Sequence, residues 1–427
     1  MKVIADLHIH SRYSRATSQK INITEITRFA QIKGLNLMGT GDFTHPQWLK
    51  ELTEDLVEVP GTSLYKPSKH PESPIHYMIT TEVSTIFTFE GHVKKIHHVL
   101  LTPNLDTATQ INERLAKYGS LSVDGRPVLD MTAPQLVEEV MEVSRENMVI
   151  PSHAWTPWFS IFGAFSGFNH VEDCYQDMTK HIFALETGLS SDPPMNWRLS
   201  ALDRFALVSN SDSHSVWPWR IGREANVFEL DRLTYQEVIE AIKKKDERFK
   251  FTIETNPAYG KYHWTGHRNC KVSLSPREAI KLENRCPVCH RKLTKGVEQR
   301  VEELADRPMG FKPEHVPGYV HLLPLSEIIS NVLGITYPGA QKVWSVYNLL
   351  IGKFGDELTV LLEIPGEELT KIVDPRIAEA IIRVREEKAR VIPGYDGVYG
   401  QLVLLEETQD MPLEKQVAGQ RSLSDFL

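Results

Sequence analysis

The chain has 427 residues, more than one hydrophobic core normally supports, so we expect two or three domains. Its four cysteines are too few for a disulfide scaffold. A formal net charge of -8 argues weakly against a nucleic-acid partner, although a carboxylate-rich metal centre also adds negative charge. The sequence has no apolar run of membrane-spanning length and no basic leader with a cleavage site, so we expect a cytoplasmic protein with no membrane partner.

Seven short runs rich in apolar and β-branched residues have the composition of buried parallel strands. They are residues 2–6, 35–39, 77–81, 96–101, 148–151, 182–185 and 205–209. Helix-like segments lie between them, and the first begins after Asn22, a good N-cap, and ends before Gly34. Repeated strand–helix–strand units predict a closed α/β barrel, in which side chains at the strand ends converge on one mouth.

Metal-binding side chains stand at or just after the ends of these runs. A lone buried histidine is usually a hydrogen-bonded core residue, but a series in register with strand ends predicts a multinuclear metal site. His8 and His10 are two apart on a strand and so share a face, and Glu82 has two oxygens with which to bridge two ions. His97 should point the opposite way from His98, so we assign it a structural role. The predicted ligands are His8, His10, Asp42, Glu82, His98, His153, Asp212 and His214.

These motifs resemble the PHP (polymerase and histidinol phosphatase) superfamily over residues 1–255. The matching segments are Asp6-Leu7-His8-Ile9-His10, Gly41-Asp42, Glu82, His98-Val99-Leu100, Ser152-His153 and Ser211-Asp212-Ser213-His214. The resemblance implies a distorted seven-stranded (β/α)7 barrel and a metal-dependent phosphoesterase with two or three divalent ions, Zn, Mn or Mg. The chain departs from the pattern at Phe43, where a histidine is usual, and around Ser14 and Arg15, where an acid is usual. His45 lies close enough to substitute for the missing imidazole.

Residues 256–300 contain three of the four cysteines and predict a small zinc-binding domain. Two pairs of donors, each with two intervening residues, are separated by fifteen residues: His267, Cys270, Cys286 and Cys289. Each pair can hold one edge of a tetrahedral ion, which predicts one structural zinc. His263 and His290 are alternative fourth ligands, and a set of buried free thiols is the alternative to a metal site.

The same region carries ten lysines and arginines against three glutamates between residues 261 and 300. A basic zinc module can lie along a phosphate backbone, whereas a charge run is more often a solvated surface. Two arginines after the last metal ligands either clamp phosphate oxygens or form surface ion pairs. The predicted DNA contacts are Arg220, Arg223, Arg268 and Lys271.

An aromatic cluster directly follows His153: Trp155, Trp158, Phe159, Phe162, Phe165 and Phe168. We expect about half of it to be core packing. A base extruded from DNA would need an apolar slot beside the metal ligands, which is the functional alternative for the rest.

Residues 301–412 are predicted to form short helices with glycine-containing connections. They are either hairpins that contact phosphates through helix N-termini or a structural cap. Residues 413–427 form a polar tail whose end resembles the sliding-clamp (PCNA) interaction peptide, with one polar residue and an apolar pair at i, i+3. These residues are Gln420, Leu423, Phe426 and Leu427.

Together these features resemble the endonuclease Q family of archaea and some bacteria over nearly the whole chain. The resemblance implies a nucleoid-associated DNA repair enzyme that uses metal-activated water to cut DNA 5′ of hypoxanthine, uracil, xanthine or an abasic site. The implied catalytic residues are His8, His10, Glu82, Asp212 and His214. A PHP small-molecule phosphatase, a proofreading 3′-5′ exonuclease and a noncatalytic clamp-bound scaffold stay open as alternatives.

Overall fold

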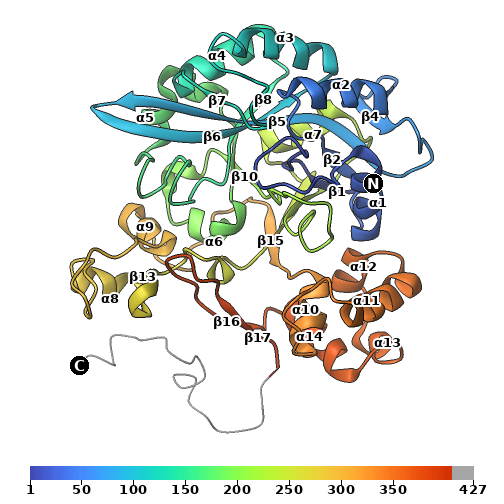
Figure 1. The fold of residues 1–427 in the computed structure, drawn as a ribbon, viewed down its shortest axis with the longest axis vertical. Helices are drawn as coiled ribbons and strands as arrows, with labels where there is room; N and C mark the ends of the chain where they lie inside the picture. The colour runs from blue at the N-terminus through green and yellow to red at the C-terminus, as the bar shows by residue number, and fades with distance from the viewer. Residues whose placement is uncertain (406–427) are drawn as a thin grey trace.

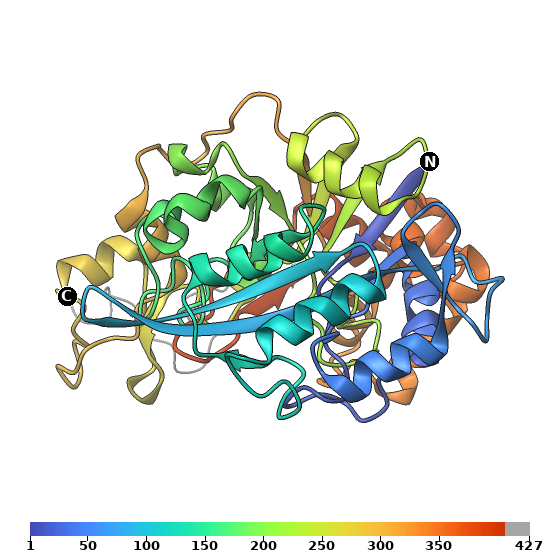
Figure 2. The ribbon, with the colours of Figure 1, turned by 90° about the horizontal axis from the view of Figure 1, so that it is seen from above.

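The computed structural model describes residues 1–405; the predicted clamp-binding residues Gln420, Leu423, Phe426 and Leu427 lie outside the described residues. The chain has an α/β fold. In Figure 1 a large N-terminal body lies above two smaller parts, one around residues 256–304 and the other around residues 324–388, and Figure 2 separates the same two parts. Within residues 1–405, no helix has both the length and the apolar character needed to cross a membrane.

An 11-stranded mixed sheet runs through the N-terminal body. Its strands are β1 (Lys2–Asp6), β2 (Leu37–Gly39), β3 (Leu56–Val59), β4 (Leu64–Pro67), β5 (His76–Phe89), β6 (His92–Thr102), β7 (Val128–Leu129), β8 (Met148–Pro151), β11 (Ala225–Glu229), β12 (Phe249–Glu254) and β15 (Gly318–His321). A separate two-stranded sheet consists of β9 (Ala184–Glu186) and β10 (Ala206–Val208). Single bridges join it to the large sheet, between Val149 and Ile182 and between Ile9 and Ser213. Each of the seven predicted strands overlaps one of these strands.

The expectation of uniform strand–helix–strand units is wrong at β5. No helix follows this strand; instead β5 and β6 form a long antiparallel hairpin, which reaches out from the body in both views. Glu90 and Gly91 make the turn with φ of 49° and 78°, the left-handed pair that a type I′ turn requires. Because β6 is antiparallel to β8 as well, the order of a parallel barrel is kept only in part.

Helices cover the sheets and build the smaller parts. They are α1 (Ile23–Lys33), α2 (Pro46–Asp55), α3 (Leu105–Leu115), α4 (Ala133–Val143), α5 (Val171–Tyr175), α6 (Pro193–Asn196), α7 (Tyr235–Lys244), α8 (Pro276–Lys281), α9 (Val297–Leu304), α10 (Leu325–Val332), α11 (Gln341–Phe354), α12 (Glu357–Leu362), α13 (Gly366–Thr370) and α14 (Pro375–Arg385). Helix α1 has the predicted ends, since the Asn22 side chain accepts a hydrogen bond from the Glu25 N–H and Gly34 has a φ of 97°. A side chain at Gly34 would also collide with Asp356, so this turn lies tightly against the helical part.

A buried ion pair joins the N-terminal body to helices α10 to α14. Lys33 Nζ lies 2.7 Å from Glu357 Oε1, with the two side chains 1% and 0% exposed, and it also donates to the Pro218 carbonyl. Aromatic rings pack beside the pair, with Trp217 of the body 6.0 Å from Trp344 of α11. The helical part is therefore docked through a specific charged contact as well as through apolar packing.

The described part of the segment 301–412, residues 301–405, contains strands as well as the predicted helices. Strand β15 pairs in parallel with β12 and so belongs to the large sheet. Strands β16 (Arg390–Ile392) and β17 (Gln401–Val403) form a hairpin. Its connection lies against the part around residues 256–304, which we call the zinc-module region. There the backbone N–H of Trp264 donates to the Gly394 carbonyl, and that of Arg268 donates to the Asp396 carboxylate. That region also holds the small sheet of β13 (Thr265–His267) and β14 (Val272–Leu274).

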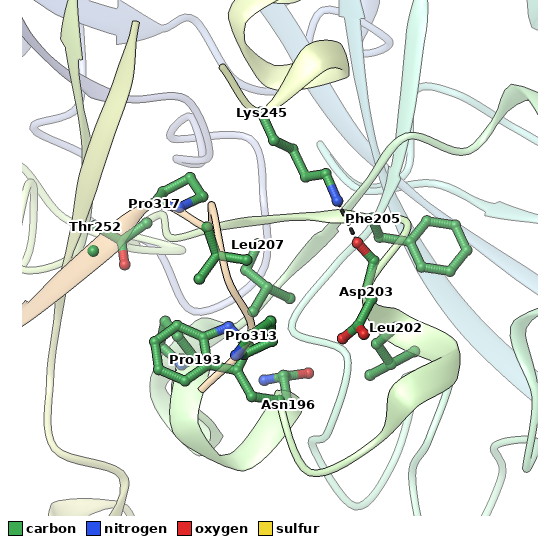
Figure 3. A pocket seen from close by; sticks show the side chains of 13 residues that line it. Pro193, Asn196, Leu202, Asp203, Phe205, Leu207, Lys245, Thr252, Pro313 and Pro317 are labelled. Atoms are coloured by element: carbon green, nitrogen blue, oxygen red, sulfur yellow. Dashed lines mark hydrogen bonds between the residues drawn. The ribbon is translucent and has the colours of Figure 1, made fainter. Parts of the chain in front are cut away.

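A small apolar hollow marks the seam where the segment before β15 crosses the N-terminal body (Figure 3). Its volume of about 20 Å³ has room for about one water molecule. Prolines and other apolar side chains line most of it: Pro193, Leu202, Phe205, Leu207, Pro313 and Pro317. Beside it Lys245 donates to the Asp203 carbonyl. No predicted metal ligand lines this hollow, so we regard it as a packing seam.

We expect Lys33→Met to lower the free energy of unfolding by about 3–5 kcal/mol, because it leaves the Glu357 carboxylate buried without its cation. Equilibrium urea unfolding followed by circular dichroism measures the change. Lys50→Met is the matched control, since Lys50 pairs with Glu54 at the surface with side chains 71% and 64% exposed. There the expected change is about 1 kcal/mol or less. Equal unfolding midpoints for the two variants would contradict the prediction.

Candidate metal centre

Four of the predicted ligands meet in one buried group. His8 and His10 follow β1, Glu82 lies in β5 and Asp212 follows β10, and each offers one atom within 4.8 Å of the others. His10 Nε2 lies 3.0 Å from Asp212 Oδ1 and 3.3 Å from Glu82 Oε2, while His8 Nε2 lies 3.6 Å from the same Glu82 oxygen. The strand ends thus converge as the sequence predicts.

The second oxygen of Glu82 faces another group of donors. His97 Nδ1 lies 3.1 Å and His153 Nε2 3.2 Å from Glu82 Oε1, and the three residues form a second group within the same 4.8 Å limit. Glu82 therefore presents one oxygen to each group, which is the geometry that a carboxylate bridging two cations requires.

The assignments of His97 and His98 are reversed relative to the prediction. In the β5–β6 ladder Ser84 is opposite His97 and Val83 is opposite His98, so His97 shares the face of Glu82, two residues from Ser84. His98 points to the other face, where Nδ1 lies 2.7 Å from the Tyr175 hydroxyl and Nε2 2.9 Å from that of Thr85. Burial lowers the pKa of His98 to about 3, which keeps its imidazole neutral in the core. His98 is a structural residue, and His97 stands in the site.

Asp42 belongs to neither donor group found among residues 1–405; it orients the candidate ligand His10 instead. Its Oδ1 lies 2.9 Å from His10 Nδ1, and its Oδ2 accepts hydrogen bonds from the Ser11 N–H and the Ser14 hydroxyl. A carboxylate on the far nitrogen of a ligating histidine fixes the ring and its tautomer. Ser14, which replaces the family's usual acid, thus supports Asp42.

His45 and His214 also lie outside the two groups. His45 stacks on Tyr13 with the ring centroids 4.4 Å apart, so it does not supply the missing imidazole. His214 is nearer, with its ring centroid 4.5 Å from that of His10, and its Nδ1 lies 3.0 Å from the Asp212 carbonyl. With its side chain 32% exposed, His214 lies at the open side of the centre.

Two residues that the sequence analysis did not identify complete the centre. Both oxygens of Glu186 lie 3.0 Å from His8 Nδ1, and the carboxylate accepts the His153 N–H at 2.8 Å. Arg126 Nη1 lies 2.9 Å from Glu82 Oε2. Glu186 directly follows the predicted run 182–185 and ends β9, so it matched the signal that found the other ligands, whereas Arg126 lies in a loop without such a pattern.

The backbone is strained at three site residues. Asp42, His153 and Asp212 have φ of 49°, 30° and 46°, in the left-handed region that residues other than glycine seldom occupy. Such conformations cluster at functional sites, where the surrounding structure enforces them. Each of these turns aims a ligand or its partner into the centre.

The donor set fits divalent cations. Among the described residues, His8 Nε2 and Glu82 Oε1 are buried atoms without a hydrogen bond, and each faces one of the two groups. Burial by itself would raise the pKa of Glu82, but His97 and Arg126 hold it well below its usual range, so the carboxylate is charged. Buried carboxylates with imidazoles and unsatisfied donor atoms are a composition that suits bound metal ions.

The zinc-module ligands also come together. One atom each of His267, Cys270, Cys286 and Cys289 lies within 4.8 Å of the others, and Cys289 Sγ lies 3.4 Å from His267 Nδ1. The alternatives His263 and His290 are outside this group; His263 faces Glu298 at 3.3 Å instead. The described cysteines and histidine thus form a candidate tetrahedral cation site.

The predicted DNA contacts divide into two places. Arg220 and Arg223 line a cavity of about 380 Å³ where the N-terminal body, the zinc-module region and α10 meet. Arg223 donates to the Ser211 carbonyl, one residue before the ligand Asp212. Arg268 and Lys271 are exposed on the zinc-module region.

An α/β fold with buried histidine and carboxylate groups at its strand ends defines a metal-dependent hydrolase of phosphate esters. The family model for the MJ0043 C-terminal domain matches residues 324–388. The lesion-specific endonuclease PfuEndoQ from Pyrococcus furiosus superposes with a TM-score of 0.85 at 33% identity, covering 98% of this chain and 99% of that chain. The chain belongs to the endonuclease Q family and is a metal-dependent endonuclease.

Two more relatives extend the comparison. A structure of endonuclease Q in complex with a 27-mer duplex carrying an abasic lesion at the active site has a TM-score of 0.84 at 33% identity, with 97% of this chain and 100% of that chain covered. The uncharacterised Methanocaldococcus jannaschii protein MJ0043 is 35% identical over 255 residues. That match covers 58% of this chain but only 31% of MJ0043, so the chain spans about a third of that relative.

We expect His97→Ala to carry about one divalent ion fewer per chain than the wild type, because it removes one of three donors in the second group. Metal analysis by plasma mass spectrometry after gel filtration measures the content. His98→Ala is the control: it should keep its ions and lose about 1–3 kcal/mol of stability, because Thr85 and Tyr175 are left without their partner. Loss of ions in His98→Ala with full content in His97→Ala would reverse the assignment.

Proposed function

We propose that the chain is a DNA repair endonuclease that cuts the phosphodiester bond 5′ of a deaminated base, hypoxanthine, uracil or xanthine, or of an abasic site. The observation that carries the proposal is the pair of donor groups that share Glu82. Two adjacent cation sites suit in-line displacement at a phosphate. The related complex with an abasic lesion at its active site supports the substrate class.

The chain would hold one cation with His8, His10, Glu82 and Asp212 and the other with Glu82, His97 and His153. Zn, Mn and Mg are the candidate ions, with Zn in the four-residue site of the zinc module. Divalent cations in such sites supply a hydroxide nucleophile at neutral pH and offset the charge of the phosphate.

The residues around the two donor groups would orient the histidine ligands and stabilise the leaving group. Glu186 and Asp42 fix the imidazoles of His8 and His10 with Nε2 toward the shared carboxylate. His214, partly exposed beside His10, would steady the leaving oxygen.

The DNA would lie where the N-terminal body, the zinc-module region and the helical part meet. Residues 1–255 would act as the catalytic domain, and the Ile9–Ser213 and Val149–Ile182 bridges support closure of its seven predicted strands as a distorted barrel. Residues 256–300 would form the zinc-binding domain, and α10 to α14 would form the core of the helical domain predicted for residues 301–412. Arg220 and Arg223 would hold the strand beside the centre, and Arg268 and Lys271 the duplex further away. Extrusion of the damaged nucleotide would favour lesions that pair poorly, since they cost less to unstack.

We expect Glu82→Ala and Asp212→Ala each to lower the nicking rate roughly 1,000-fold or more, because both side chains belong to the shared donor groups. The assay uses closed circular DNA with a single deoxyuridine, deoxyinosine or abasic site, and lesion-free circles, with Mg, Mn or Zn supplied in turn. Glu58→Ala, at an exposed position of β3, should cut like the wild type.

The same assay separates the rival functions. A small-molecule phosphatase leaves every circle intact, and an exonuclease needs a free end. Equal nicking of lesion-free circles, or full activity in both ligand variants, would refute the proposed function.

We further propose that residues 413–427 bind a sliding clamp, which would keep the enzyme at the nucleoid. The support is the sequence pattern, in which Gln420 suits a polar pocket and Leu423, Phe426 and Leu427 suit an apolar one.

We expect Phe426→Ala in the full-length chain to weaken binding to the purified clamp by at least about 10-fold, because a buried aromatic anchor of an interface is usually worth 2 kcal/mol or more. Surface plasmon resonance measures the affinity. Glu414→Ala, in the polar part of the tail, is the control and should bind normally. Unchanged affinity of the Phe426 variant would argue against the clamp motif.

A further inference from the structure

The loop that follows His153 divides its aromatic side chains between the core and the surface. Trp155, Phe162 and Phe168 are 1%, 1% and 4% exposed. Trp158 and Phe165, between them in sequence, are 43% and 47% exposed. Half of the cluster is therefore core packing, and Trp158 and Phe165 need a separate explanation, because large apolar side chains that stay partly exposed contribute less to stability than buried ones.

The exposed rings form one ordered surface. Trp158 and Phe165 stack with centroids 4.9 Å apart and an interplanar angle of 12°. Tyr262, which enters from the zinc-module region, meets Trp158 edge-on at 5.4 Å and 78°. We call these three residues the aromatic ledge. A flat face of this kind suits another flat aromatic group.

The ledge is fixed in place before any ligand arrives. The Phe165 N–H donates to the Pro157 carbonyl and the Phe162 N–H to the Ala154 carbonyl. Arg300 of α9 donates to the carbonyls of Phe162 and Phe168 and so clamps the loop from the zinc-module side. The entropy of ordering the loop is therefore lost on folding and not on binding.

The ledge is also coupled to the metal centre. The Thr156 hydroxyl lies 2.9 Å from His153 Nδ1 and donates to the Trp158 carbonyl at 3.0 Å. The ring of Phe159, next in sequence, lies 4.7 Å from that of His97. Thr156 thus links His153, and Phe159 links His97, to the loop that carries Trp158 and Phe165.

One cation lies at a ring of the ledge and two more lie at other rings of the loop that carries it. Lys95 lies 5.4 Å from the Phe159 ring, Lys94 4.4 Å from that of Phe168, and Lys261 5.5 Å from that of Tyr262. Aromatic rings interleaved with lysines match a nucleic acid, whose bases stack on the rings while its phosphates meet the cations.

We propose that the aromatic ledge stacks on the bases that flank the damaged nucleotide once that nucleotide has left the helix, and so holds the duplex open for cleavage. This inference rests on the proposed function. The partner is duplex DNA at the lesion, because a ring surface bordered by cations beside a phosphate-hydrolysing centre is complementary to a helix with a gap in its base stack. Trp158 and Phe165 are thus positioning residues for substrate opening and do not act in the hydrolysis itself.

The test compares one lesion in two settings: a deoxyuridine paired with adenine in a duplex, and the same deoxyuridine inside an unpaired bubble. We expect Trp158→Ala and Phe165→Ala to lower the single-turnover rate on the paired duplex about 10- to 100-fold and on the bubble by less than about 3-fold, since stacking is needed only where the helix must be opened. Trp158→Phe should recover most of the loss. Met309→Ala, an exposed apolar position elsewhere at 74% exposure, should match the wild type on both substrates.

A second readout does not depend on cleavage. The duplex carries 2-aminopurine next to the lesion. Binding of the Glu82→Ala variant to this duplex should change the 2-aminopurine fluorescence. The double variant Glu82→Ala, Trp158→Ala should give a smaller change. Equal losses on duplex and bubble, or no loss on either, would overturn the role of the ledge. If the wild type cuts neither substrate, the proposed function fails first and the ledge inference with it.

Discussion

The centre depends on a single buried carboxylate that is shared between two sets of histidines. A fully buried charge is stable only when cations or hydrogen-bond donors surround it. Glu82 lies in the middle of β5, and its neighbours come from the middle of β6 and from just after β1, β8 and β10. The strands must therefore converge at Glu82 for its charge to be tolerated, and that convergence is what brings ligands distant in sequence within reach of common cations.

The apolar runs and the period-2 spacing were enough to predict seven of the strands and most of the centre, but not β3, β4, β7, β11, β12 and β15 of the large sheet. They placed His8, His10, Glu82 and Asp212 together, since each directly follows, or lies in the loop after, one of the predicted runs, although β5 continues through Glu82 to Phe89. They failed for the His97 and His98 pair, because two adjacent residues on a strand point to opposite faces and composition alone does not say which face is the inner one. That choice is set by the ladder with β5, and the ladder is set by a two-residue turn at Glu90-Gly91 that the runs did not reveal.

Residues that act through a ligand were harder to predict than the ligands. Glu186 stands at a strand end, where the same reasoning applied, but nothing in its immediate sequence marks it as the partner of His8. Arg126 lies in a loop and meets Glu82 only through tertiary folding. The grouping of His267, Cys270, Cys286 and Cys289 was, in contrast, predicted from the sequence, because two close pairs of candidate ligands depend on local spacing and little on the rest of the fold.

The parts of the chain are tied together by contacts that pass close to the chemistry. Arg300 of α9 clamps the loop after His153, and Trp217, three residues after His214, packs on Trp344 of the helical part. Loops that carry ligands are thus supported from outside the sheet, which explains how irregular segments can hold strained backbone conformations.

The Lys33–Glu357 pair has a consequence for the independence of the N-terminal body. Its ammonium group lies at the end of the helix that follows the first two histidine ligands, and its counter-charge belongs to a helix more than three hundred residues away. A catalytic domain separated from the helical region would lose the carboxylate partner of Lys33 and uncover the face against which α10 to α14 pack, so transfer of this domain into another architecture would require a new cover for that face.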